Sequence, residues 1–321
     1  MTQFALLCLI VCLAWAALLM AAGTILAQAS WTFLRRAGLD RRILRRPSLL
    51  FLIRTLPLNL PAAVIFLGVL PSFLKLEPNE TAEQPEWWLI GLAFLSLASA
   101  GIFLFRMTVI LTRTWQMRRT LLRDARRFDV NGPIPTYIVV APDRMVAVVG
   151  IVHPQLFIGR RVFDCLTRKE LQAAIAHEIA HVQAFDNLKQ VLLRAMRVPG
   201  LFTESEHALR NAAEIAADEC ALRDQIPPLD LGAAIIKVAR LNASPSLTAI
   251  AASHLVPDFE SSALRMRVEH IQSALEEKSL GEQQGPTCCC CIAGLALLIL
   301  YFAKLPFWLA LTHRVTELLV R

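Results

Sequence analysis

The chain has 321 residues, of which 55% are hydrophobic, and its formal net charge is +7. A mean hydropathy of +0.50 excludes an ordinary soluble protein. The positive charge is carried largely by arginine clusters that flank apolar segments, which indicates contact with anionic lipid rather than a nucleic-acid-recognition module. We therefore expect a membrane protein with the lipid bilayer as a partner and no direct nucleic-acid binding.

Four apolar segments are each long enough to cross a hydrocarbon core of about 30 Å, which needs roughly 20 helical residues. They are Phe4–Ala27, Leu49–Leu74, Trp87–Thr112 and Cys288–Leu311. The first is expected to be a retained span and not a signal peptide, because no basic residue precedes it and six arginines follow it. The second contains three prolines, so we expect it to be broken and not one continuous helix.

The loops between these segments alternate in charge. Six arginines and one acid follow the first span, one lysine and four glutamates follow the second, and six arginines follow the third. Because Lys and Arg collect on the cytoplasmic side, both termini are expected outside and the region after the third span in the cytoplasm. This pattern predicts a multi-pass membrane protein.

Three regions follow from this layout. Residues 1–112 are predicted to form a three-span region, 113–287 a cytoplasmic α+β domain, and 288–321 a fourth span with a short outer tail from Thr312. The domain is expected to contain a helical connector to Phe128, three strands and several helices. The predicted strands are Thr136–Ala141, Met145–Val152 and Gln155–Gly159, and the main helices are Leu171–Phe185, Leu201–Gln225, Gly232–Leu241 and a basic helix with Arg265 and Arg267.

The most informative motif is His177-Glu178-Ile179-Ala180-His181. A helix is expected here, because Thr167–Glu170 has the form of a capping box and the next fifteen residues contain no Gly or Pro. Residues four apart on a helix are offset by about 40°, so His177 and His181 project side by side. Two imidazoles so placed can bind one zinc ion, and Glu178 beside them can act as general base toward a water at the metal.

A catalytic zinc site needs a third protein ligand, and Glu214 is the candidate on the next long helix, with Asp218 one turn later on the same face. The resulting reaction would be peptide-bond hydrolysis, which also requires a group that stabilises the tetrahedral oxyanion. The sequence offers four candidates for that group and does not choose among them: Tyr137, His207, His254 and Arg265. The sheet before the helix has two possible uses. Its edge strand can pair with an extended substrate, or the sheet can serve simply to bury the back of the helix.

Together these elements resemble the BlaR/MecR-type antirepressor metallopeptidases, integral-membrane zinc proteases of the gluzincin group. The matching segments are Gly150–Gln155, Glu170–His181, Asp186-Asn187 and Glu214–Glu219, and the order of three spans, protease and fourth span also fits. The resemblance implies an α-helical protein of a bacterial inner (plasma) membrane, with four transmembrane helices and an α+β gluzincin-type zinc metallopeptidase domain between spans three and four.

Residue by residue, the resemblance implies that His177, His181 and Glu214 bind one zinc ion and that Glu178 is the catalytic base. Asp218 would orient a histidine ligand, and Asp186 would support the helix end or a ligand. The antibiotic-sensing members carry an extracellular penicillin-binding domain after the last span. Only ten residues follow Leu311 here, so we expect no such sensor domain.

Three functions remain open at this point. The first is regulated cleavage of a cytoplasmic target such as a DNA-binding transcriptional repressor, with a signal from a sensor partner or through a homodimer. The second is quality control of membrane proteins, as in the HtpX/Ste24-like proteases, which share much of this helix chemistry. The third is a non-proteolytic membrane transducer with a structural metal site, for which Glu178 would be dispensable.

Overall fold

The computed structural model describes residues 2–38, 46–76, 85–129, 132–243, 261–277 and 304–320. The chain forms two compact units. One, which we call the apolar-helix unit, comprises Met1–Arg36, Leu52–Leu104 and Glu282–Arg321. The other, the α+β unit, comprises Ala37–Phe51 and Phe105–Gly281. Each is described by itself below.

The described part of the chain contains three helical segments that are long and apolar enough to cross a membrane: Gln3–Arg36, Leu56–Leu76 and Trp87–Arg123. They correspond to the first three predicted spans and indicate a membrane protein. The helices are α1 (Thr2–Arg36), the α4–α5 segment and α6 (Trp87–Arg123). Most of the predicted fourth span, residues 288–303, lies outside the described residues.

The second span is broken, as its prolines predict. Helix α3 (Pro47–Arg54) ends before Thr55, and α4 (Leu56–Val64) follows with one proline in its first turn and Pro61 inside it. The chain then continues as a π-helical segment, η1 (Ile65–Val69), and as α5 (Leu70–Leu76). Proline removes a backbone donor and disturbs the preceding turn, which accounts for the irregular hydrogen bonding of this segment.

The residues predicted as an outer tail are mostly helical. Helix α15 runs from Leu305 to Val320 and packs on η1 and α5 within the apolar-helix unit. The contact is close because Gly68 has no side chain: a Cβ there would lie 3.0 Å from Cγ2 of Thr312. Trp15 Nε1 also donates a hydrogen bond to Thr316 Oγ1 at 3.2 Å. The absence of Gly and Pro after Pro306 and this packing favour a continuous helix over a free tail.

The α+β unit contains a four-stranded sheet in the order β1-β2-β4-β3. The strands are β1 (Arg126–Phe128), β2 (Thr136–Val139), β3 (Val146–Val149) and β4 (Gln155–Gly159). Strand β2 is parallel to β4, and the other two pairs are antiparallel. The three predicted strands are present. The prediction of a helical connector as far as Phe128 is wrong for its last residues, because α6 ends at Arg123 and Arg126–Phe128 form β1, which pairs with β2.

The two faces of the sheet bury different residues because side chains alternate along each strand. Val148, Leu156 and Ile158 face a core shared with Leu171 and Ile175 of the helical layer. The opposite face buries a second cluster against the end of α6, formed by Leu121, Val139, Met145, Val149 and Phe157. Strand β3 lies at one edge of the sheet, and its connection to β4 turns at Gly150, whose φ of +114° favours glycine.

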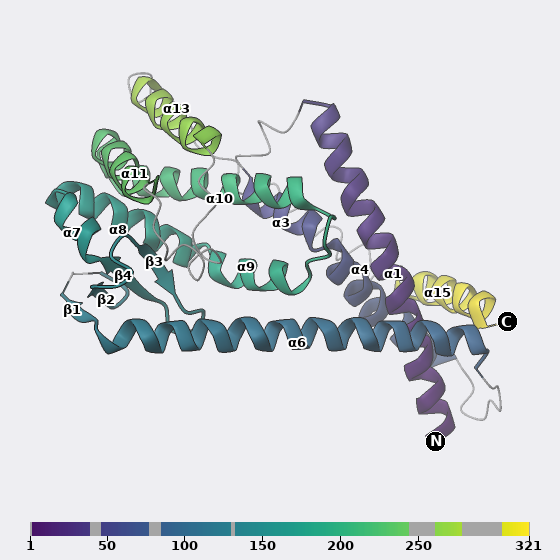
Figure 1. The fold of residues 1–321 in the computed structure, drawn as a ribbon. Coiled ribbons are helices and arrows are strands. Elements are labelled where there is room, and N and C mark those ends of the chain that lie inside the picture. The colour runs from purple at the N-terminus through teal and green to yellow at the C-terminus, as the bar shows by residue number, and fades with distance from the viewer. Residues whose placement is uncertain are drawn as a thin grey trace. The chain divides into compact units, whose positions relative to one another are not determined.

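Within the described residues, the helices that follow the sheet in the chain are α7 (Arg160–Cys165), α8 (Arg168–Gln183), α9 (Asp186–Ala195), α10 (Thr203–Arg223), α11 (Pro228–Ala243) and α13 (Ser261–Glu277), all labelled in Figure 1. The predicted capping box is present, since Thr167 N donates to Glu170 Oε2 at 2.7 Å and Glu170 N donates to Thr167 Oγ1 at 3.4 Å. Lys237 of α11 binds the same Glu170 oxygen at 2.7 Å. Helix α9 was not predicted.

Helices α8 and α10 pack together at small residues. Ala173 and Ala221 are fully buried in a cluster with Leu231 of α11 and Ile271 of α13. Alanine at a helix contact allows a close approach of the two backbones, so side chains one or two turns away can meet across the interface. This packing places the face of α8 that carries the two histidines opposite the face of α10 that carries Glu214.

Candidate active site

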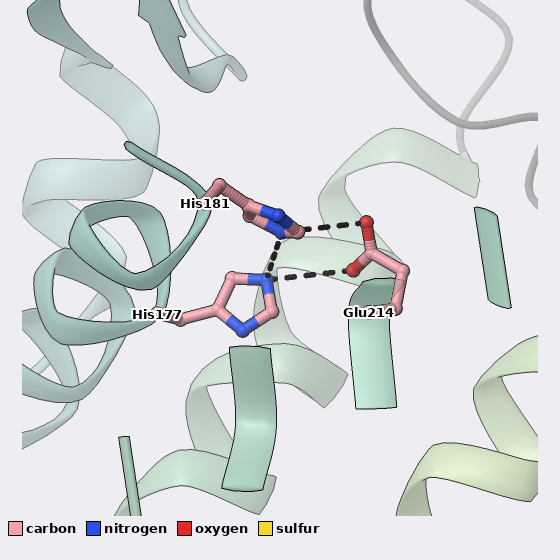
Figure 2. A group of neighbouring side chains, drawn as sticks. All are labelled: His177, His181 and Glu214. Atoms are coloured by element: carbon pink, nitrogen blue, oxygen red, sulfur yellow. Dashed lines mark hydrogen bonds and ion pairs between the residues drawn. The ribbon is translucent and has the colours of Figure 1, made fainter. Parts of the chain in front are cut away.

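His177 and His181 lie next to each other on α8, one turn apart (Figure 2). Their ring centroids are 4.8 Å apart with the planes nearly perpendicular, and their Nε2 atoms are 3.2 Å apart. His177 is buried and His181 is partly buried. Both Nε2 atoms therefore point into one small volume.

Glu214 reaches this volume from α10 (Figure 2). Its Oε2 lies 3.4 Å from His177 Nε2, and its Oε1 lies 3.6 Å from His181 Nε2. Ligand atoms that bind a tetrahedral zinc ion at about 2.0–2.1 Å lie about 3.3 Å from one another. The three observed separations are close to that value. The donor set of two imidazoles and one carboxylate thus fits a zinc ion in both chemistry and spacing.

A carboxylate lies next to the Nδ1 atom of each histidine. Asp218 Oδ1 lies 2.9 Å from His177 Nδ1, and Asp186 Oδ2 lies 2.8 Å from His181 Nδ1. Asp218 is completely buried, and Asp186 is additionally paired with Lys189 at 3.0 Å. Carboxylates in these positions hold the imidazole rings in orientation and leave the Nε2 atoms free to bind a metal. The sequence analysis proposed a supporting role for these two aspartates, and each lies within 3 Å of a histidine Nδ1 atom.

Glu178 is half-buried on α8 beside the two histidines. Burial raises the pKa of its carboxyl group, whereas the charges of His177 and His181 and the backbone N–H of Val148 in β3 lower it. The first effect prevails, so the pKa lies above that of an ordinary glutamate. A carboxylate with a raised pKa is a better proton acceptor, which suits a general base.

The ligand residues form a tightly coupled set of charges. Burial by itself lowers the pKa of His177, but the carboxylates of Asp218 and Glu214 raise it to about 9. Burial by itself raises the pKa of Glu214, but Arg267 and the two histidines hold that pKa well below the usual range. Without a metal, the carboxylates are thus balanced by a histidinium and a guanidinium.

Arg267 of α13 is the site residue that the sequence analysis did not assign. Its guanidinium binds Asp218 with two nitrogens, Nε and Nη2, both at 2.8 Å, and its Nη1 lies 2.8 Å from Glu214 Oε2. Nη2 is also 3.5 Å from His177 Nε2. Helical periodicity places Arg267 on the same face as Ile271, one turn later, but the sequence does not say that this face is buried against α10.

Two of the described oxyanion candidates, Arg265 and Tyr137, lie away from the site. Arg265 is 81% exposed and pairs with Glu269 on the outer side of α13. Tyr137 stacks on Phe157, on the sheet face opposite α8. His207 contacts Arg210 on its own helix at 3.0 Å. The fourth candidate, His254, lies outside the described residues.

The fold and the site define a class of protein before any comparison. Two histidines from a HExxH helix, a glutamate from a second helix and a glutamate base are the arrangement of a gluzincin-type zinc metallopeptidase. Residues 112–247 match peptidase family M48, and this match supports that class. No match was found among curated proteins. The matched segment contains α8 and α10, and therefore all three metal-ligand candidates, while Arg267 lies beyond it.

Proposed function

We propose that this chain is a membrane-bound, zinc-dependent endopeptidase whose active site faces the cytoplasm. The observation that carries the proposal is the geometry of Figure 2, in which three ligand atoms of His177, His181 and Glu214 converge at separations that suit tetrahedral zinc. Glu178 lies on the same helix as the two histidines and supplies a base that a structural zinc site does not need.

The residues of the site have separable roles in this reaction. Bound zinc would supply a Lewis acid that polarises the scissile carbonyl and lowers the pKa of a water. Glu178 accepts the proton of the attacking water and delivers it to the departing amine. Asp218 and Asp186 hold the two imidazoles in orientation. Arg267 is a positioning residue, because its nitrogens are already committed to the carboxylates of Asp218 and Glu214.

The cytoplasmic location is inferred from the arginine-rich segments after the first and third spans. On this proposal residues 1–112 form the three-span region, 113–287 the cytoplasmic protease domain, and 288–321 a fourth span with the C-terminal helix. Both termini would lie outside a bacterial inner membrane. A signal would reach the protease through the spans, a sensor partner or a homodimer.

The proposed substrate is a cytoplasmic protein such as a transcriptional repressor, cleaved at one or a few sites. A second candidate is a quality-control protease of membrane proteins. The match of residues 112–247 to peptidase family M48 supports a metallopeptidase and does not distinguish the two candidates. The two differ in the number of substrates and not in the chemistry of the site.

The test is a comparison of new protein N-termini in cells that express the wild type or Glu178→Ala. One or two Glu178-dependent cleavages in a DNA-binding protein are the result expected for a regulator. Many cleavages in membrane proteins would instead assign quality control. No Glu178-dependent cleavage, including under cell-envelope stress, would contradict the peptidase and favour a non-proteolytic transducer.

A further inference from the structure

Asn187 connects the first turn of α9 to the edge strand of the sheet. Its Nδ2 donates to the carbonyl oxygens of Val148 at 3.1 Å and of Gly150 at 3.0 Å. Val148 belongs to β3, which has β4 on one side only, and Gly150 follows at the turn toward β4. A side-chain amide carries two donor hydrogens, so one asparagine can satisfy both acceptors. The residue before Asn187 is Asp186, whose carboxylate lies against the metal-ligand candidate His181.

The sheet end of this connection is rigid. Strand β3 pairs with β4 along its whole length, and the three central residues of β4 are completely inaccessible to solvent: Leu156, Phe157 and Ile158. Val149 of β3 is also buried. Close-packed interiors allow little displacement of the backbone that they contain. The carbonyl groups that accept from Asn187 therefore give α9 a fixed point of attachment.

The first turn of α9 has little apolar burial to hold it in place. Phe185, which precedes the helix, is 67% exposed, and Leu188 is 45% exposed. The buried apolar residues of α9, Val191 and Ala195, lie one to two turns further on. Phe185 also has a φ of +56°, a left-handed conformation that a residue with a Cβ keeps only where the surrounding structure imposes it. The two hydrogen bonds of Asn187 supply this restraint.

The orientation of Asp186 depends on the same turn. Its Oδ2 lies 2.8 Å from His181 Nδ1, and its Oδ1 lies 3.0 Å from Lys189 Nζ. Lys189 is three residues later on the same helix, so its contact moves with α9 and does not fix Asp186 relative to α8. Asn187 links this turn to the sheet instead. A displaced first turn would lengthen the bond from Asp186 to His181 and release the imidazole ring.

We propose that Asn187 is a positioning residue of the metal site. By fastening α9 to β3 it holds Asp186 against His181, and so keeps His181 Nε2 directed at the metal. The inference rests on the zinc site of the proposed function and deepens it, because it gives the sheet a part in zinc binding. It differs from a general stabilising role in one respect: the effect of Asn187 on zinc affinity passes through Asp186.

A double-mutant cycle tests this path. The zinc dissociation constant of the full-length, detergent-solubilised protein is measured by competition with a chromophoric chelator. Asn187→Leu should raise this constant about 10-fold, and Asp186→Ala should raise it about 10- to 100-fold, as for losses of groups that orient a metal-binding histidine. Adding Asn187→Leu to Asp186→Ala should then change it by less than about 2-fold, because the residue through which Asn187 acts is already absent.

Gln190→Leu is the matched control. It exchanges an amide for a hydrocarbon three residues later on the same helix, leaves the hydrogen bonds of Asn187 in place and should bind zinc as the wild type does. Asn187→Ala is measured in the same two backgrounds, because it removes the amide without placing a branched side chain against β3. Thermal unfolding in the presence of the chelator establishes that each variant is folded at the temperature of the measurement.

The outcomes separate this inference from the proposed function. Unchanged zinc affinity in both Asn187 variants would overturn the inference. An equal loss of affinity in the wild-type and Asp186→Ala backgrounds would also overturn it, because the loss would then not pass through Asp186. A wild type that binds no zinc would refute the inference and the proposed function together. A zinc-binding wild type that cleaves no peptide, with the predicted cycle, would refute the peptidase alone and support the role of Asn187.

Discussion

Replacing Arg267 with leucine should destabilise the metal-free protein strongly. The guanidinium is shared by Asp218, which is completely buried, and by Glu214, one turn earlier on the same helix. Leucine fills a similar volume but leaves two carboxylates close together with only the histidines to balance them. Removing one partner of a buried ion pair costs about 3–5 kcal/mol. For a domain of this size that loss lowers the midpoint of thermal unfolding by roughly 6–20 °C.

The assay is thermal unfolding of the detergent-solubilised protein, with and without zinc, and Arg265→Leu is the matched control. Arg265 lies two residues away on α13, is 81% exposed and pairs with a glutamate that is 59% exposed. Its loss should cost about 0–1 kcal/mol. Added zinc should recover part of the Arg267→Leu loss, because the metal neutralises Glu214 and binding stabilises the folded state. Equal unfolding temperatures for the two variants would refute the proposed charge balance.

Three further changes test other parts of the site. Glu214→Ala should remove a ligand and yield protein that purifies without zinc, as measured by elemental analysis; a full equivalent of zinc would exclude Glu214 as a ligand. Asp186→Asn should weaken zinc binding about 10- to 100-fold in competition with a chelator, because His181 loses the carboxylate that orients it; unchanged affinity would contradict that role. Thr167→Ala should cost about 1 kcal/mol by removing the cap of α8, visible as a drop of roughly 2–4 °C in unfolding temperature; no drop would show that the Lys237–Glu170 pair alone fixes the helix start.

Local sequence signals predicted the features whose residues lie close together in the sequence. Once a helix is predicted, the four-residue spacing of His177 and His181 places their side chains next to each other, and the capping box that begins at Thr167 predicted that helix. The i, i+4 spacing of Glu214 and Asp218 similarly placed both carboxylates on one face of α10. These features do not depend on how distant segments pack.

The features that were missed depend on tertiary packing. Arg265 and Arg267 are two residues apart and therefore about 200° apart around α13, so only contact with α10 decides which one enters the site. Strand β1 has three residues and exists through its pairing with β2, which overrides the helical preference of its neighbours. The position of Tyr137 was open because a strand pattern alone does not say which face meets α8.

The most direct test of the central claim is to measure zinc content and peptide cleavage together on purified wild type and Glu178→Ala. The account predicts one zinc per chain in both proteins. It predicts cleavage by the wild type only, because Glu178 is the base and not a ligand. A zinc-replete Glu178→Ala protein that cleaves as the wild type does would contradict the mechanism, and a wild type that binds no zinc would contradict the site itself.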